Sequence, residues 1–204
     1  MEKRYLHREP GKISFEQRCT SYGQKPAIFW FTGLSGAGKS TIADLFEKAL
    51  FECGRIVFTL DADDLRKRLN ADLGFSMKDR AENVRRAAES ARLLQDAGVI
   101  VLATFISPTR SSREKARAIA RDGLFFEVYV KAGLETCMAR DPKGFYQKAL
   151  DGKIKNFTGV DSIYEVPKNA DILLDTDKNT ARECVEKLFV FAQEKGIINK
   201  ENNA

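Results

Sequence analysis

One short stretch constrains this chain more than any other. Residues 33–40 read Gly-Leu-Ser-Gly-Ala-Gly-Lys-Ser and match the phosphate-loop pattern G-x-x-x-x-G-K-[ST]. Such a loop needs a strand before it and a helix after it. The sequence predicts both elements, because residues 27–32 are aromatic and β-prone, and residues 39–53 carry apolar side chains at helical spacing. The alternative is a glycine-rich turn that binds nothing.

The residue types in this loop explain how it would bind a phosphate chain. Its glycines allow positive φ, so that several backbone N–H groups can point inward, and the helix start adds a partial positive charge. Lys39 should reach the β and γ phosphates, and the Ser40 hydroxyl should ligate Mg²⁺. The motif therefore predicts a nucleoside triphosphate ligand, but it does not identify the acceptor.

Composition and charge exclude several classes of protein. The chain has 204 residues, 43% of them hydrophobic and 31% charged, which is typical of one globular domain. No apolar run approaches the roughly 20 residues that span a bilayer, so we expect no membrane segment. Residues 1–9 lack the apolar core of a secretory signal, which favours the cytoplasm. The net charge of +5 is spread along the chain, so we expect no nucleic-acid partner.

Cysteine and histidine usage narrows the possible chemistry further. The chain has no C-x-x-C pair and a single histidine, His7, and its four cysteines are Cys19, Cys53, Cys137 and Cys184. This pattern predicts reduced thiols and argues against a zinc site or a histidine-activated nucleophile. Catalysis would then depend on carboxylates, cations, backbone N–H groups and a bound metal ion.

Strand and helix patterns alternate along the chain. Residues 1–26 are interpreted as an N-terminal extension and residues 27–204 as one domain, with a lid over about 141–168. The predicted strands are 27–32, 56–60, 99–106, 124–130 and 171–174. The predicted helices are 14–19, 39–53, 77–97, 110–121, 134–140 and 180–195. This order predicts an α/β fold with a mostly parallel central sheet and helices on both faces, in three α/β/α layers.

Two carboxylates follow the second predicted strand. Asp61 and Asp63 lie at its carboxyl end, where open α/β sheets bind their ligands. One could accept the proton of the acceptor hydroxyl and the other could hold the Mg²⁺ shell. The alternative for Asp61 is an N-cap, with Asp64 in an acidic first turn. Arg66 shares a helical face with Asp63 and suits an anionic acceptor, or simply pairs with Asp63.

Other residues are candidates for binding the acceptor. Arg80 and Asn83 share a helix face and could hold an oxyanion, although such a cluster also suits a solvated surface. Phe75 lies in a turn and could stack on a base, although a single phenylalanine is more often part of the core. Ser107 follows the third strand and either donates to a phosphate or caps the next helix. The lid offers cations and an aromatic cover, and a closed lid would exclude water, or it is an ordinary loop.

Several of these segments, in order, resemble the adenylyl-sulfate kinase family. The phosphate loop is generic, and Leu60-Asp-Ala-Asp follows it in the same order as in the family. The later segments are specific to the family: Asp72-Leu-Gly-Phe-Ser, Glu82-Asn-Val-Arg-Arg, Phe105-Ile-Ser-Pro, Arg140-Asp-Pro-Lys-Gly and Lys155-Asn-Phe-Thr-Gly. The resemblance covers roughly residues 12–195. It implies a P-loop kinase fold and a homodimer. The implied reaction transfers the γ-phosphoryl group of MgATP to the 3′-hydroxyl of adenosine 5′-phosphosulfate (APS), giving PAPS and ADP.

The resemblance also implies roles by position. Residues of the ATP site would be Gly33, Leu34, Ser35, Gly36, Ala37, Gly38, Lys39, Ser40, Thr41 and Arg140. Residues of the APS site would be Arg66, Phe75, Arg80, Asn83, Ile106, Ser107, Lys143 and Phe157, with the adenine between Phe75 and Phe157. Catalytic residues would be Asp63 as base, Asp61 as its partner or in the Mg²⁺ shell, Lys39, and Ser107 as a phosphorylated intermediate. Direct in-line transfer needs no such intermediate.

The sequence departs from the family pattern beside the proposed base. Ala62 and Asp64 stand where Gly and Asn are usual, Lys67-Arg68 replaces a commoner His-Gly pair, and Thr104 replaces a small residue. These departures leave open a kinase of the same fold that uses another anionic nucleotide or metabolite. A guanine-nucleotide switch would need Asn-Lys-x-Asp, and the nearest match, residues 199–202, ends in asparagine.

Overall fold

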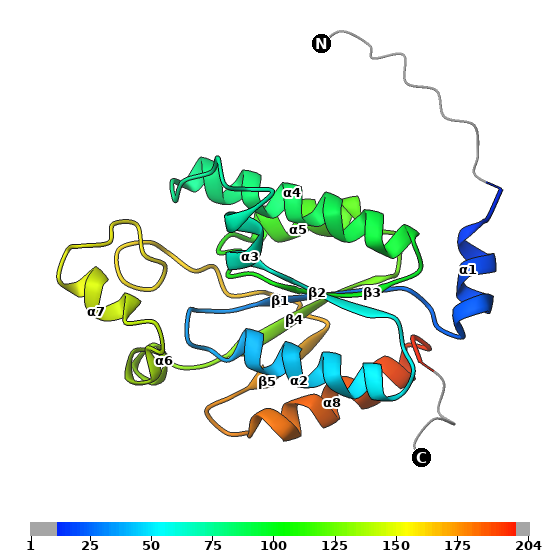
Figure 1. The fold of residues 1–204 in the computed structure, drawn as a ribbon. Coiled ribbons are helices and arrows are strands. Elements are labelled where there is room, and N and C mark those ends of the chain that lie inside the picture. The colour runs from blue at the N-terminus through cyan, green and yellow to red at the C-terminus, as the bar shows by residue number, and fades with distance from the viewer. Residues whose placement is uncertain (1–11, 199–204) are drawn as a thin grey trace, which may run out of the picture.

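The computed structural model describes residues 12–198. His7 and the 199–202 segment lie outside this range. The helices are α1 (Phe15–Tyr22), α2 (Lys39–Glu52), α3 (Ala62–Lys67), α4 (Met77–Asp96), α5 (Arg110–Ile119), α6 (Leu134–Arg140), α7 (Phe145–Leu150) and α8 (Ala181–Glu194). The strands are β1 (Ile28–Thr32), β2 (Val57–Asp61), β3 (Ile100–Thr104), β4 (Phe125–Lys131) and β5 (Ile172–Asp175) (Figure 1).

A five-stranded parallel sheet lies at the centre of the fold. Its strand order is β2-β3-β1-β4-β5, and every pairing is parallel. The predicted three-layer α/β/α architecture is therefore confirmed. The central strand β1 is buried along its whole length, as expected of a strand covered on both faces. Because all strands are parallel, their carboxyl ends meet at one edge of the sheet, and the loops at that edge form the candidate site.

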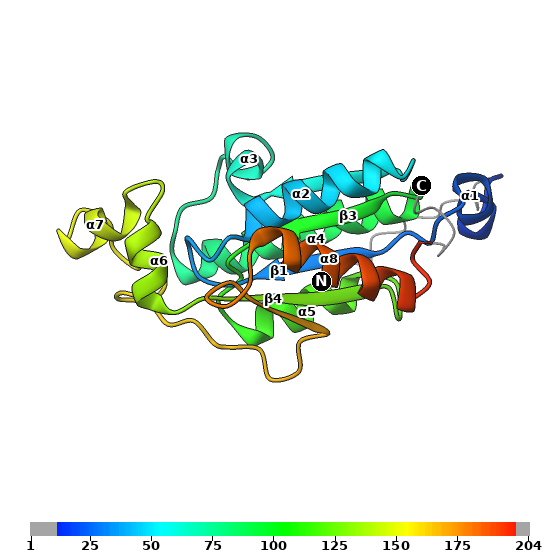
Figure 2. The same cartoon turned by 90° about the horizontal axis from the view of Figure 1, so that it is seen from below.

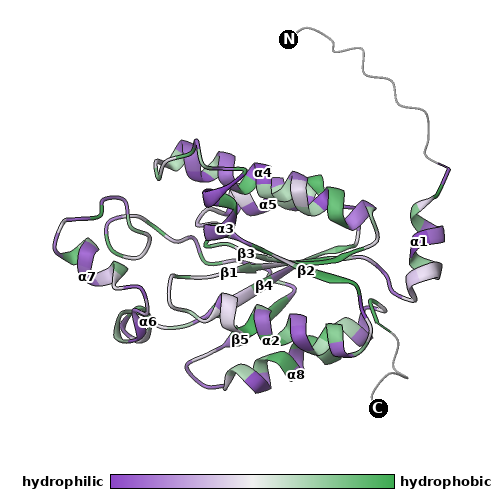
Figure 3. Cartoon of the chain, viewed as in Figure 1, coloured by the Kyte–Doolittle hydropathy of each residue, from purple (hydrophilic) through white to green (hydrophobic). Residues whose placement is uncertain are grey.

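Each face of the sheet carries its own hydrophobic core. On one face, Phe46 and Leu50 of α2 and Leu188 of α8 pack with Phe29 of β1, and Figure 2 shows these two helices across the sheet. On the other face, α4 packs against the sheet through small side chains such as Ala87 and is followed by α5. Figure 3 shows that the apolar sides of the helices turn toward the sheet. Among residues 12–198, no helix combines the length and apolarity needed to cross a membrane.

The indole of Trp30 lies at the centre of this second core. It stacks between the rings of Phe105 and Phe125, with centroid separations of 5.0 and 5.8 Å. Trp30 therefore fixes the spacing of β1, β3 and β4 just below the edge where the site forms.

The segment before β1 is attached to the opposite edge of the sheet. The predicted helix forms as α1, and Ser14 caps it in a capping box with Gln17. The Gln24 amide then donates to the carbonyls of Ile56 and Gly98 at 2.8 and 2.9 Å. Residues 14–24 are thus held far from the candidate site, as Figure 1 shows for α1.

Two short helices lie at the edge of the sheet where the candidate site forms. α3 follows β2 directly and fits the helical face that the sequence predicted for Asp63 and Arg66, whereas α7 lies inside the predicted lid and was not expected, because its periodicity is too short to detect. The Asp141 carboxylate accepts hydrogen bonds from the backbone N–H groups of Phe145 and Gln147, at 2.8 and 3.2 Å, which stabilises the start of α7. The third predicted strand ends two residues early, because Ser107 adopts a positive φ of 39° and the chain turns away.

Candidate functional site

The phosphate loop connects β1 to α2, as its sequence predicts. Gly36 and Gly38 have φ values of 74° and 100°, and Gly38 is the N-cap of α2. Gly33 has a φ of 152°, and a Cβ built on it would lie 2.3 Å from the carbonyl oxygen of Val130. The loop therefore requires glycine at position 33 for space as well as conformation, because Val130 belongs to the paired strand β4.

Lys39, the first residue of α2, points back over the loop. Its ammonium donates hydrogen bonds to the carbonyls of Gly33 and Leu34, at 3.0 and 2.7 Å. Burial lowers the pKa of Lys39 to about 8, because desolvation disfavours the charged form. A phosphate chain laid along the loop would meet this ammonium and the first N–H groups of α2 together.

Asp61, at the carboxyl end of β2, is held by three hydrogen bonds. Its Oδ2 accepts from the hydroxyls of Ser40 and Thr104, at 3.0 and 2.7 Å, and its Oδ1 accepts from the backbone N–H of Asp63 at 2.8 Å. Burial alone would raise the pKa of Asp61, but these bonds outweigh it and the pKa lies below its ordinary value. The N-cap interpretation of Asp61 is confirmed, because it caps α3. Its carboxylate also meets the phosphate-loop serine, and its role in catalysis or in the Mg²⁺ shell stays a prediction.

Asp63 lies in the first turn of α3 and forms an ion pair with Lys143 of the lid. This contact joins residues 80 apart in the chain, and both side chains remain about half exposed. The lid also reaches the phosphate loop, because the Tyr146 hydroxyl donates to the carbonyl of Ser35 at 3.0 Å. Residues 141–168, the predicted lid, thus contact both the phosphate loop and the acidic turn, and Figure 1 shows α7 beyond the sheet edge. That this segment acts as a lid stays a prediction.

Arg66 and Phe75 lie together on the exposed side of the acidic turn. The Arg66 guanidinium lies 4.4 Å from the centroid of the Phe75 ring and donates to the carbonyl of Gly74 at 2.9 Å. The Phe75 side chain is 62% exposed, which is unusual for a large apolar ring. An exposed aromatic ring backed by a guanidinium is a suitable surface for a nucleobase.

Arg80 links the Phe75 turn to the lid. Its guanidinium donates to the carbonyl of Phe75 at 2.9 Å, to the Thr158 hydroxyl at 2.7 Å and to the carbonyl of Asn156. Desolvation by burial lowers the pKa of Arg80. Three partners on two segments make this arginine a bridge rather than a solvated surface residue.

Asn83 and Phe157 are both buried. Asn83, one turn after Arg80, accepts a hydrogen bond from the Asn70 amide at 2.9 Å. Phe157 is 8% exposed and packs against Tyr146, with ring centroids 4.9 Å apart. The two aromatic residues expected around one adenine therefore differ sharply, since Phe75 is open and Phe157 is part of the core of the lid. Their sandwich around a base stays a prediction.

Ile106 and Ser107 follow β3 at the same edge of the sheet. The carbonyl of Ile106 accepts a hydrogen bond from the Thr32 hydroxyl at 2.7 Å. Ser107 is 2% exposed, and its hydroxyl accepts a hydrogen bond from the Trp30 indole at 3.1 Å. The alternative in which Ser107 caps the next helix is wrong, because Thr109 is the N-cap of α5. The roles of Ser107 in binding and catalysis stay predictions.

Arg140, at the end of α6, lies on the other side of the phosphate loop. Its guanidinium donates to the Thr176 hydroxyl and carbonyl, at 3.0 and 2.8 Å, and to the carbonyl of Gly36 at 3.4 Å. The Thr176 hydroxyl in turn donates to the carbonyl of Ala37 at 3.0 Å. Our sequence analysis did not identify Thr176. Its position directly after β5, at the carboxyl end of a strand, is the signal that could have found it.

The remaining candidates fall on the same edge of the sheet. The structure brings together the phosphate loop, the acidic turn, the Phe75 turn, the 105–108 turn and the lid. Thr41, in the first turn of α2, follows Lys39 and Ser40 there. Residues that our sequence analysis missed include Thr32, Thr104 and Tyr146, each of which holds one of these loops by a side-chain hydrogen bond.

Comparison with known proteins agrees with this geometry. The family model described as adenylylsulphate kinase matches residues 25–175. The chain belongs to the adenylyl-sulfate kinase family. It is 50% identical over 187 residues to the adenylyl-sulfate kinase of Marinobacter nauticus, covering 92% of this chain and 94% of that protein. It is also 55% identical over 192 residues to the bifunctional enzyme NodQ of a Rhizobium species, covering 94% of this chain but 30% of NodQ.

A solved member of the family has the same fold. The Mycobacterium tuberculosis APS kinase CysC, in complex with AMPPNP and APS, superimposes with a TM-score of 0.81 at 46% identity. The match covers 83% of this chain and 99% of that chain. The chain thus spans nearly the whole length of the Marinobacter nauticus protein and of the CysC chain, whereas it spans about a third of NodQ.

The departures from the family pattern can now be placed. Ala62 is the first residue of α3, where a glycine is not required. The Asp64 carboxylate pairs with Lys67 at 3.0 Å on the exposed side of the same helix, so two of the departures stabilise each other. A third, Thr104, supplies one of the three hydrogen bonds to Asp61. These changes adjust α3 and Asp61 and leave the phosphate loop unaltered.

Proposed function

We propose that this chain is an adenylyl-sulfate kinase, which transfers the γ-phosphoryl group of ATP to the 3′-hydroxyl of APS and so acts in sulfate assimilation. One observation carries the proposal. The phosphate-loop Ser40 meets the Asp61 carboxylate, Asp63 follows it in the first turn of α3, and the exposed Phe75 ring on Arg66 offers a surface for a nucleobase. A simple sugar or a small acid would not need that exposed ring.

The donors around Asp61 fit a magnesium ion. Mg²⁺ prefers oxygen ligands and in nucleotide sites uses one or two protein groups, with phosphates and water as the rest. Ser40 and Asp61 supply a hydroxyl and a carboxylate whose oxygens lie 3.0 Å apart. These two residues would hold the ion, which when bound neutralises charge on the β and γ phosphates.

The remaining residues of the site would position the two substrates. The backbone of residues 33–40 and the Lys39 ammonium would bind the phosphates, while Arg140, held by Thr176, would lie near the adenine of the donor. Arg66 and Arg80 both contact the exposed Phe75 and would pair with the phosphosulfate. Asp63 would accept the proton of the attacking hydroxyl, after exchanging its ion pair with Lys143.

The lid would exclude water, which competes with the acceptor for the phosphoryl group. Lys143 reaches Asp63 from one end of the lid, and Arg80 holds Thr158 at the other end. Closure over both substrates would direct the phosphoryl group from ATP to the hydroxyl of the acceptor nucleotide rather than to water.

The oligomeric state and location belong to the same proposal. We propose a homodimer, which the family resemblance implies. The edge strand β2 supports it, because Phe58 of this strand and Ile56 directly before it are exposed. Sedimentation at micromolar concentration tests it, and a Phe58→Glu variant should be monomeric. A cytoplasmic location is supported by Cys19, Cys53, Cys137 and Cys184, all of which are free thiols.

An acceptor panel tests the activity. ADP release from MgATP should depend on APS and should disappear with the 3′-deoxy analogue of APS, because that compound lacks the attacking oxygen. CMP and simple sugars serve as competing acceptors. Turnover with another acceptor only would show that the chain is a kinase of the same fold with a different substrate.

Asp63→Ala tests the assignment of the base. It should lower kcat by roughly 100-fold or more while ATP still binds, since a general base contributes on that order and Asp63 makes no contact with the phosphate loop among the described residues. An unchanged kcat would exclude Asp63 as the base.

A further inference from the structure

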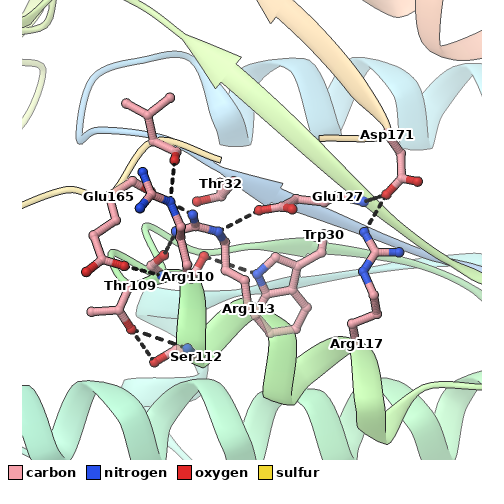
Figure 4. A network of polar contacts seen from close by, with 12 residues as sticks. Trp30, Thr32, Thr109, Arg110, Ser112, Arg113, Arg117, Glu127, Glu165 and Asp171 are labelled. Carbon is pink, nitrogen blue, oxygen red and sulfur yellow. Dashed lines mark hydrogen bonds and ion pairs between the residues drawn. The ribbon is translucent and has the colours of Figure 1, made fainter. Parts of the chain in front are cut away.

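Arg113, a residue of α5 outside the proposed binding site, joins three separate segments. It is 3% exposed. Its Nε donates to the Glu127 carboxylate at 2.5 Å, its Nη1 to the carbonyl of Ser107 at 2.7 Å, and its Nη2 to the carbonyl of Glu165 at 2.6 Å. Figure 4 shows the guanidinium between Glu127 and the chain around Glu165.

The ion pair with Glu127 fixes this guanidinium to the sheet. Glu127 lies on β4, and its backbone N–H donates to Asp171 at 2.7 Å, next to the last strand. The guanidinium group of arginine is planar and rigid. Once the contact with Glu127 fixes Nε, the directions in which the two Nη groups donate are therefore fixed as well. The rigid sheet therefore determines where the carbonyls of Ser107 and Glu165 must lie.

The first of these carbonyls belongs to a strained turn. Ser107 has a φ of 39°, one of two positive values among non-glycine residues within residues 12–198. The Trp30 indole holds its hydroxyl at 3.1 Å, and Arg113 holds its carbonyl. Such backbone persists only where its surroundings specify it, and it is concentrated at binding sites. This turn carries the Ile106–Ser107 backbone that the proposed function assigns to the acceptor.

The second carbonyl belongs to residues 164–166, which we call the lid root because they follow the lid segment that Arg80 holds. The Glu165 N–H donates to the carbonyl of Pro108 at 2.8 Å. The Tyr164 hydroxyl lies 2.9 Å from the Thr32 hydroxyl, which also donates to the carbonyl of Ile106 at 2.7 Å. The lid root and the 105–108 turn are thus held as one unit directly beside the phosphate loop.

We propose that Arg113 is a positioning residue for the acceptor nucleotide. It holds the 105–108 turn and the lid root in the single arrangement that binds APS, without touching the substrate. This inference rests on the proposed function, because it concerns the acceptor half of that site. Arg113 is too deeply buried to contact a ligand, and its three partners include none of the residues proposed to bind ATP.

The test is Arg113→Lys, which keeps the positive charge beside Glu127 but removes the planar fork. The KM for APS should rise about tenfold, the effect of losing roughly one charge-assisted hydrogen bond, while the KM for ATP stays within about twofold. Arg117→Lys is the matched control. Arg117 lies one turn later on α5, and within the described residues its hydrogen bonds go to Asp171 and to the carbonyl of Phe125. It should leave the KM for APS unchanged.

A second variant keeps the test decisive if Arg113→Lys does not fold. Tyr164→Phe removes only the hydroxyl contact with Thr32 and keeps the ring on Tyr129, so it should raise the KM for APS about threefold. Equal effects on the KM values for APS and ATP, or no effect on either in a folded variant, would overturn the inference. Failure of the unaltered protein to use APS while it uses another acceptor would refute the proposed function, and the inference with it.

Discussion

Replacing Asp61 by asparagine tests the structure of the acidic turn most directly. Asparagine has nearly the same shape, and it can still accept from the Asp63 N–H through its carbonyl oxygen. Its amide nitrogen would then face the hydroxyls of Ser40 and Thr104, which now donate to the Asp61 carboxylate at 3.0 and 2.7 Å. Both hydroxyls can rotate to accept instead, so the bonds are kept but the charge is lost.

The expected cost follows from those bonds. A hydrogen bond to a charged group contributes about 1 kcal/mol more than a neutral one, and three such bonds are affected. Asp61 is partly exposed and would be relieved of its desolvation cost, so the net loss in free energy of unfolding should be about 1–2 kcal/mol. The effect on kcat should be larger, at roughly 100-fold or more, because the variant also loses the carboxylate that we propose as a ligand of Mg²⁺.

Denaturation in urea measures the stability and coupled ADP release measures the rate. Asp64→Asn is the matched control, because that carboxylate pairs only with Lys67 on the exposed side of α3 among the described residues, and it should change stability by less than about 0.5 kcal/mol. The lowered pKa of Asp61 also sets the pH dependence. Its stabilisation is fully present above the ordinary value of 3.8 and is lost as the pH falls through the lower folded-state value. An Asp61→Asn protein as stable as the unaltered chain at pH 7, or a difference that persists in acid, would refute this account.

Two further predictions concern the phosphate loop. Gly33→Ala should lower the free energy of unfolding by about 3 kcal/mol or more, because its Cβ would lie 2.3 Å from the carbonyl oxygen of Val130. The control is Gly144→Ala, where φ is 63° and a Cβ would have nothing within 4 Å. It should lower the free energy of unfolding by about 1 kcal/mol in the same urea assay. Lys39 has a folded-state pKa of about 8 against an ordinary value of 10.5. Between these two values the unfolded chain binds more protons than the folded chain, so the free energy of unfolding should rise as the pH increases from 8 to 10.5. The Lys39→Met variant should lack this rise. If its stability followed the same pH profile as that of the unaltered chain, buried Lys39 would not be the cause of the rise.

Much of the fold could be read from residue spacing. The apolar run before Gly33 predicted β1, and the helical spacing after Lys39 predicted α2, because both signals are local. The cap of α1 by Ser14 was predictable for the same reason. The helix α7 was not, since one and a half turns inside a polar segment give no period, and its start depends on the Asp141 carboxylate.

The sequence by itself determined the chemistry of this protein, and the tertiary structure decided which groups meet. The motif at residues 33–40 and the carboxylates after β2 specify a phosphate loop and an acidic turn through short-range spacing alone. Spacing does not reveal that Lys143 reaches Asp63, or that Arg113 ties Ser107 to Glu165, because these contacts join residues on different loops. Such pairs come together only when the parallel sheet brings the carboxyl ends of its strands to one edge.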